Sequence, residues 1–101
     1  MSNVNKTNIV NYFNVDKTDV KQVGSKQLFI VDAYAPKNRI NARVLVSYYT
    51  IIGIFDGMKW RITTKKYSPT TSKQITQFHR ETPFDIVRID EDELQALLDR
   101  G

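Results

Sequence analysis

The chain has no cysteine and only one histidine, His79, among its 101 residues. Without cysteine there are no disulfide bonds, no thiolate zinc sites and no thiol nucleophiles. One histidine cannot build a multi-histidine metal centre, so we expect neither a metal site nor a cofactor. The four glycines are scattered along the chain, which excludes a glycine-rich phosphate-binding loop. No other pattern suggests a catalytic site, and we expect a protein that is not an enzyme.

Long apolar runs are also missing. The longest strongly apolar stretch, residues 44–55, is interrupted by Ser47, Thr50 and Gly53 and is too short to span a bilayer as a helix. The N-terminal residues do not show the basic and then apolar pattern of a signal peptide. We therefore expect a cytoplasmic protein that does not associate with a membrane. The length predicts a single domain over residues 1–101, partly irregular over residues 1–26.

The strongest local pattern is a β-hairpin centred on Asp56 and Gly57, a pair typical of a two-residue type I′ turn. We interpret residues 42–55 as its first strand, running without a break to the turn. A two-residue loop would place Gly53 opposite Trp60 on an apolar face, where the glycine leaves room for the indole. This face is predicted to be the core face.

The other face of the hairpin would combine isoleucines from the first strand with Lys59 and Arg61 from the second. One interpretation is a half-covered face on which long cationic side chains lie over the isoleucines. The other is an exposed basic and aromatic sheet surface that binds nucleic acid. The sequence favours the first interpretation and leaves the second open.

Further elements flank the hairpin. Residues 26–34 and 84–89 are predicted strands, and residues 8–15 could form a short strand. A helix is predicted to begin near Thr71, and a second helix follows its N-cap Asp90. The fold class is therefore α+β, with an antiparallel sheet of about three strands, a central Asp-Gly hairpin and two packed helices.

The hydroxyl-rich segment 67–74 has two interpretations. Thr71 and Gln74 match a capping box, and Ser68 or Thr70 are alternative N-caps, so helix capping alone explains the hydroxyls. The free amides of a helix start, with Lys73 in the first turn, would also suit an anion.

Charge is segregated along the chain. Residues 58–80 contain six lysines and arginines and no acid, whereas residues 85–99 contain six acids and one arginine. These runs can be ordinary solvated faces, or the first can attract a polyanion. We select the following residues as a candidate nucleic-acid-binding set: Tyr48, Lys59, Arg61, Lys65, Lys66, Thr70, Thr71 and Lys73.

Two motifs carry a resemblance. They are a Ser-Tyr-x-Thr strand at Ser47, Tyr48 and Thr50, and a Tyr-Ser-x-Thr-Thr helix start from Tyr67 to Thr71, with Phe78 following in the helix. In these motifs the chain resembles a family of small uncharacterised proteins from phages, plasmids and other mobile elements. Gln74 stands where members of that family often have histidine. The resemblance implies a short accessory protein and no particular activity.

These observations lead to two hypotheses. The first is a non-enzymatic accessory protein of a phage or other mobile element that binds nucleic acid through the basic strand and helix start. The alternative is a protein-binding module that inhibits or modulates a host protein, for example a defence enzyme, through a sheet edge or the acidic C-terminal helix. An unpaired sheet edge leaves both a monomer and a homodimer open.

Overall fold

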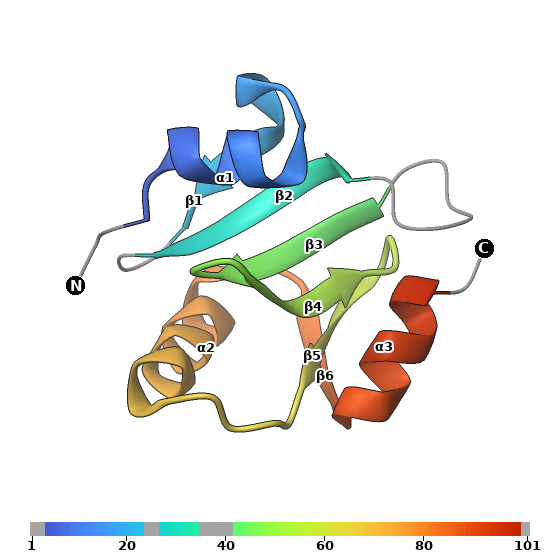
Figure 1. Cartoon of the computed structure of the whole chain (residues 1–101). Helices are drawn as coiled ribbons and strands as arrows, with labels where there is room; N and C mark the ends of the chain where they lie inside the picture. The colour runs from blue at the N-terminus through green and yellow to red at the C-terminus, as the bar shows by residue number, and fades with distance from the viewer. Residues whose placement is uncertain (1–3, 24–26, 35–41, 100–101) are drawn as a thin grey trace.

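The computed structural model describes residues 4–23, 27–34 and 42–99. Within these ranges six strands form one sheet in the order β1-β2-β3-β4-β5-β6 (Figure 1). The strands are β1 Val20–Gln22, β2 Leu28–Tyr34, β3 Ala42–Ser47, β4 Thr50–Phe55, β5 Lys59–Thr63 and β6 Asp85–Ile89. The helices are α1 Lys6–Phe13, α2 Pro69–Glu81 and α3 Glu91–Asp99, with a short 3-10 turn at Lys17–Asp19.

Neighbouring strands are antiparallel from β1 to β5, and β6 then pairs parallel to β5. Parallel neighbours need a crossover connection, and α2 supplies it between β5 and β6. Helix α2 packs on one face of the sheet, whereas α1 and α3 pack on the opposite face (Figure 1). The sheet is therefore covered on both sides.

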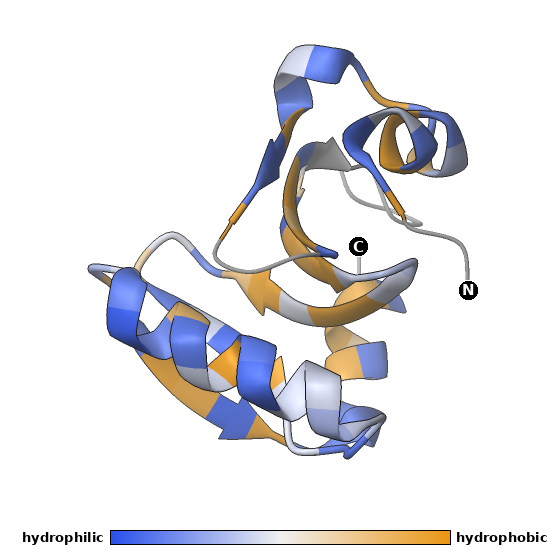
Figure 2. Cartoon of the chain, turned by 90° about the vertical axis from the view of Figure 1, so that its left-hand side faces the viewer, coloured by the Kyte–Doolittle hydropathy of each residue, from blue (hydrophilic) through white to orange (hydrophobic). Residues whose placement is uncertain are grey.

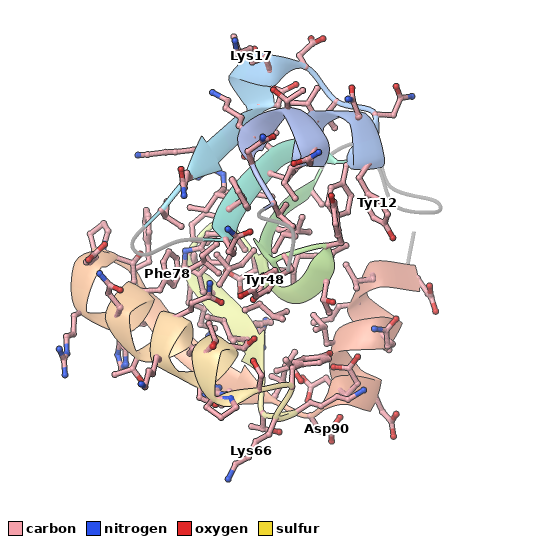
Figure 3. All side chains as sticks on the ribbon, turned by 60° about the vertical axis from the view of Figure 1, so that its left-hand side comes forward. Tyr12, Lys17, Tyr48, Lys66, Phe78 and Asp90 are labelled. Carbon is pink, nitrogen blue, oxygen red and sulfur yellow. The ribbon has the colours of Figure 1, made fainter. Side chains whose placement is uncertain are left out.

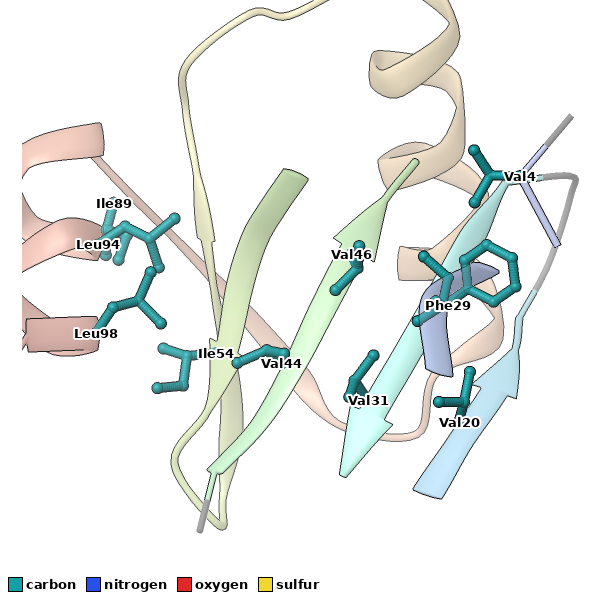
Figure 4. Close-up of a cluster of buried hydrophobic side chains, with 11 residues drawn as sticks. Val4, Val20, Phe29, Val31, Val44, Val46, Ile54, Ile89, Leu94 and Leu98 are labelled. Atoms are coloured by element: carbon teal, nitrogen blue, oxygen red, sulfur yellow. The ribbon is translucent and has the colours of Figure 1, made fainter. Parts of the chain in front are cut away.

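Each face of the sheet has its own apolar core. On the α1 and α3 side, Ile9 and Leu94 reach the sheet and are completely buried, together with strand residues such as Val44 (Figure 4). On the α2 side, Ile75 and Phe78 cover Trp60, which is only 2% exposed. Burying an apolar side chain such as Ile75 or Phe78 stabilises the fold by about 1.5–3 kcal/mol.

The prediction of a three-stranded antiparallel sheet with two helices is wrong, because the described residues form a mixed sheet of six strands with three α-helices, although the α+β class agrees with the structure. One error is the short strand expected at residues 8–15. This segment lies mostly in α1, where Asn5 is the N-cap and shares a capping box with Asn8. Asn14 ends the helix in the left-handed conformation. Asparagine favours both positions, so the polar flanks of this segment are helix caps.

The continuous strand expected over residues 42–55 is also wrong. The chain reverses at Tyr48 and Tyr49, so that Ser47 pairs with Thr50 and the stretch forms both β3 and β4. Tyr48 has a φ of 58°, which is uncommon for a bulky residue. Its backbone N–H donates to the Gln27 carbonyl at 2.8 Å, a contact between segments that holds this turn in place.

The hairpin at Asp56 and Gly57 exists, but its register differs by two residues from the prediction. Phe55 pairs with Trp60, and Gly53 pairs with Ile62. The cause is the Asp56 carboxylate, whose Oδ1 accepts hydrogen bonds from the Met58 and Lys59 amides at 2.8 Å each. These amides also lower the pKa of Asp56. A shift of two residues preserves side-chain alternation, so Trp60 still faces the core.

A register irregularity between β3 and β4 changes the faces predicted for the isoleucines. Leu45 pairs with Gly53 and Val46 with Ile51, which leaves Ile52 as the extra residue of a β-bulge. Ile52 is buried on the α2 side and Ile54 on the α3 side, and both are almost fully covered. The hairpin thus has no exposed isoleucine face.

Candidate functional site

The hydroxyl-rich start of α2 is a buried hydrogen-bond network. Ser68 is the N-cap, and its Oγ accepts from the Thr71 backbone N–H at 3.1 Å. Ser47 Oγ donates to Gln74 Oε1 at 2.7 Å and lies 3.3 Å from Thr71 Oγ1. Ser47, Thr71 and Gln74 are all buried. The network therefore attaches α2 to the end of β3, which gives Thr71 a structural role.

A second network joins the start of α3 to the end of β5. Glu91 Oε1 accepts hydrogen bonds from Thr63 Oγ1 and Tyr67 OH, each at 3.0 Å, and Glu91 Oε2 accepts from Gln95. Burial alone would raise the pKa of Glu91, but these hydrogen bonds and the nearby Lys65 charge lower it. Burial and the Glu91 carboxylate raise the pKa of Tyr67 to about 12.

The outer side of α2 is polar and basic. Thr70, Lys73 and Arg80 are exposed, and Lys66 is exposed in the connection before the helix. Figure 2 shows that α2 is largely hydrophilic on the side away from the sheet, and Figure 3 shows Lys66 extending into solvent from the connection before the helix. We call Lys66, Thr70, Lys73 and Arg80 the basic α2 face. A shallow groove lined by Lys73, Arg80 and the polar side chains between them follows it.

The structure does not bring all the predicted binding residues onto this face. Lys59 and Arg61 alternate with the buried Trp60, so they lie on the α3 side of the sheet, and Arg61 Nε is 3.2 Å from Asp56 Oδ2. Lys65 lies over the Tyr67 ring, with Nζ 5.0 Å from the ring centroid.

Tyr48 is also separated from the basic α2 face. It is half-buried and packs against the core of the α1 and α3 side. Among the predicted residues, only Lys66, Thr70 and Lys73 are members of the basic α2 face.

A cleft of about 490 Å³ opens near the C-terminal end of α2. Its walls include Trp60 and Phe78 from the α2-side core and Phe84 from the connection to β6. Asp32 and Arg43, which form an ion pair between β2 and β3, also line it. This volume lies within the range typical of small-ligand sites.

Sequence reasoning missed this cleft because its residues come from five separate parts of the chain. Asp32 and Arg43 did carry a local signal, since each is a charged residue within an apolar strand pattern. Phe84 was only the expected start of a strand, and no sequence pattern places it beside Phe55, at 4.8 Å between ring centroids.

Some sites are absent from the part of the chain that the structure describes. Residues 4–23, 27–34 and 42–99 contain no group of three or more histidine or acidic side chains arranged to hold a metal ion. None of the helices within these ranges is long and apolar enough to cross a bilayer.

Fold and surface together define a small α+β protein with a mixed sheet covered on both faces and a basic outer helix. The chain belongs to a family of unknown function (DUF8033), whose model matches residues 7–96. No curated protein and no solved structure matches the chain. The family description assigns neither an activity nor an origin.

Proposed function

We propose that this chain is a small non-enzymatic accessory protein that binds nucleic acid through the basic α2 face. One observation carries the proposal: the exposed cations of α2 lie on one side of the sheet, and the acids of α3 lie on the other. From Met58 to Arg80 the sequence contains no acidic residue, and Glu81 is the one acid that lines the groove with Lys73 and Arg80. A cation-rich surface of this kind binds phosphates by releasing their counterions.

The polar side chains on the same helix suit phosphate contacts. Ser72, Thr76 and Gln77 line the groove between Lys73 and Arg80. Hydroxyl and amide groups commonly donate to phosphate oxygens, which fixes the orientation of a protein on nucleic acid without reading its sequence. The proposed binding therefore depends on salt and has little sequence preference.

The two sequence motifs support an accessory role in a phage or other mobile element. Their buried residues, Ser47 and Thr71, hold α2 on the sheet. The motifs would then maintain the helix that presents the cations, while the cations themselves make the contacts. In this proposal the basic strand contributes less to binding than the helix.

The test is fluorescence anisotropy with labelled single-stranded DNA, duplex DNA and RNA at low and near-physiological salt. Lys73→Glu combined with Arg80→Glu should weaken binding at least about tenfold and reduce the slope of log affinity against log salt. Lys6→Glu combined with Lys17→Glu is the matched control, because it changes net charge equally on the other side of the sheet. Equal loss in both double variants, or no binding by the wild type at low salt, would refute the proposal.

A second candidate function is protein binding, and an exposed tyrosine pair favours it. Tyr12 at the end of α1 is 64% exposed, Tyr49 in the β3–β4 turn is 39% exposed, and their ring centroids are 4.8 Å apart. Tyrosine is enriched at protein interfaces. A host protein retained by the wild type and lost from Tyr12→Ala combined with Tyr49→Ala would support this function. Retention of the host protein by both the wild type and the double variant would exclude the tyrosine pair as the binding surface.

A further inference from the structure

We propose that the nucleic acid is single-stranded and that the cleft beside α2 receives one of its unstacked bases. This inference rests on the proposed function, since the strand would reach the cleft along the basic α2 face. The groove on α2 and the cleft are both lined by Glu81, at the C-terminal end of the helix. A nucleic-acid strand whose phosphates contact Lys73 and Arg80 therefore reaches the mouth of the cleft.

The cleft offers an aromatic surface of the kind that bases stack on. Phe84, Phe55, Trp60 and Phe78 form a continuous series, with successive ring centroids 4.8, 5.1 and 5.4 Å apart. Trp60 and Phe78 are almost fully buried and support the series from within, whereas Phe84 is 42% exposed at the cleft. Base stacking on an aromatic side chain tolerates any sequence, because every base has a π-face.

Polar groups at the cleft wall suit the edge of a base. Arg43 Nε bonds to Asp32 Oδ1, and the Arg43 guanidinium lies 5.5 Å from the centroid of the Phe55 ring. The remaining guanidinium N–H groups can donate to a base, and the second Asp32 oxygen can accept. Lys21 is exposed at the rim and forms no ion pair among the described residues.

The same geometry disfavours a duplex. A base in a duplex is paired and stacked, and its extrusion opposes binding by a few kcal/mol, whereas a single strand presents bases that are already accessible. The basic α2 face alone would bind both forms. The cleft therefore supplies the preference for single strands.

The experiment compares a labelled single-stranded oligonucleotide, an abasic strand of the same length and a duplex hairpin, all at low salt. The wild type should bind the single strand about tenfold or more tightly than the other two. Of the three ligands, only the single strand with its bases should change the fluorescence of Trp60, the one tryptophan in the chain. The abasic strand tests the cleft without any substitution in the protein.

Variants at Phe84 test the stacking. Phe84→Ala should lose about tenfold in single-strand affinity with an unchanged salt slope, and Phe84→Tyr should retain the affinity. Tyr12→Ala is the control, because it removes an exposed aromatic ring from α1, on the opposite face of the sheet from the basic α2 face. Equal affinity for all three ligands, with no effect of Phe84→Ala, would overturn the proposal that the cleft receives a base. The proposed function would still stand. Absence of binding to every nucleic acid would overturn both.

Discussion

Ser47 at the end of β3 and Gln74 in α2 are joined by a buried hydrogen bond of 2.7 Å from Ser47 Oγ to Gln74 Oε1. Both side chains are polar and are buried where α2 packs against the sheet, mostly through apolar contacts. In such a position a hydrogen bond matters mainly because its loss leaves a buried group unpaired. The position of α2 on the sheet therefore depends on this contact.

We expect Ser47→Ala to lower the free energy of unfolding by about 1–3 kcal/mol, because it removes the donor to Gln74 Oε1 and the neighbour of Thr71 Oγ1. Urea unfolding measures the change. Ser72→Ala removes an exposed hydroxyl from the same helix and should change stability by less than about 0.5 kcal/mol. Equal effects of the two substitutions would show that the buried network is not a stabilising contact.

Gly53 lies where β4 and β5 approach closely. A Cβ at this position would be 3.0 Å from Ile62 Cγ1 and 3.1 Å from the Arg61 carbonyl oxygen. Because Ile62 is fully buried and the carbonyl belongs to the sheet, neither can move away freely. We expect Gly53→Ala to destabilise the fold by about 1–3 kcal/mol in urea unfolding. An unchanged or increased stability would show that the β4–β5 packing can relax around a methyl group.

The Tyr67–Glu91 pair predicts a fall in stability at alkaline pH. The folded protein raises the pKa of Tyr67 from 10.0 to about 12, so the neutral phenol is favoured in the folded state. A raised folded pKa contributes stability that is complete below pH 10.0 and is lost as the pH rises to about 12. Unfolding free energies measured across this window should decline for the wild type.

Tyr67→Phe is the control for this decline. It removes the titrating hydroxyl and the hydrogen bond to Glu91, so it should be less stable at neutral pH and should lose the part of the alkaline decline due to Tyr67. Glu91 should affect stability at the opposite end of the pH range. Its lowered pKa contributes stability that is lost as the pH falls through the folded value. Parallel alkaline curves for wild type and Tyr67→Phe would exclude Tyr67 as the source.

Glu81 is the acid at which the groove and the cleft meet, and it lowers the positive potential there. Its Oε2 accepts a hydrogen bond from Gln77 Nε2 at 3.0 Å. If the two proposals hold, Glu81→Gln should tighten single-strand binding a few-fold at low salt and have little effect at high salt. Glu93→Gln makes the same charge change on α3 and should have a smaller effect. Equal tightening would indicate that only net charge matters.

Elements with strong local signals could be predicted from the sequence. Helix α3 follows from Asp90, whose Oδ1 accepts from the Glu93 N–H at 2.7 Å, and from leucines at helical spacing. Strand β2 follows from its run of β-favouring residues. The capping box predicted for Thr71 and Gln74 is wrong, because both residues are buried inside α2, and Ser68, an alternative N-cap in the sequence, is the N-cap.

Other features depend on contacts between distant segments. The turn at Tyr48 and Tyr49 contains no glycine, proline or asparagine, and its hydrogen bond from Tyr48 goes to Gln27, far away in the chain. The basic α2 face could be predicted only in part for the same reason. The run of cations between Met58 and Arg80 is visible in the sequence, but strand alternation turns Lys59 and Arg61 away from the face of α2.

The placement of α2 and α3 on opposite faces of the sheet has a consequence for encounter with a partner. The exposed cations of α2 on one side and the carboxylates of α3 on the other give these two helices together an electric dipole directed across the sheet. In the field of a polyanion this dipole produces a torque that turns the protein before any contact forms. If the chain binds nucleic acid as proposed, productive collisions begin with α2 in front, and the rate of association falls as added salt screens that torque.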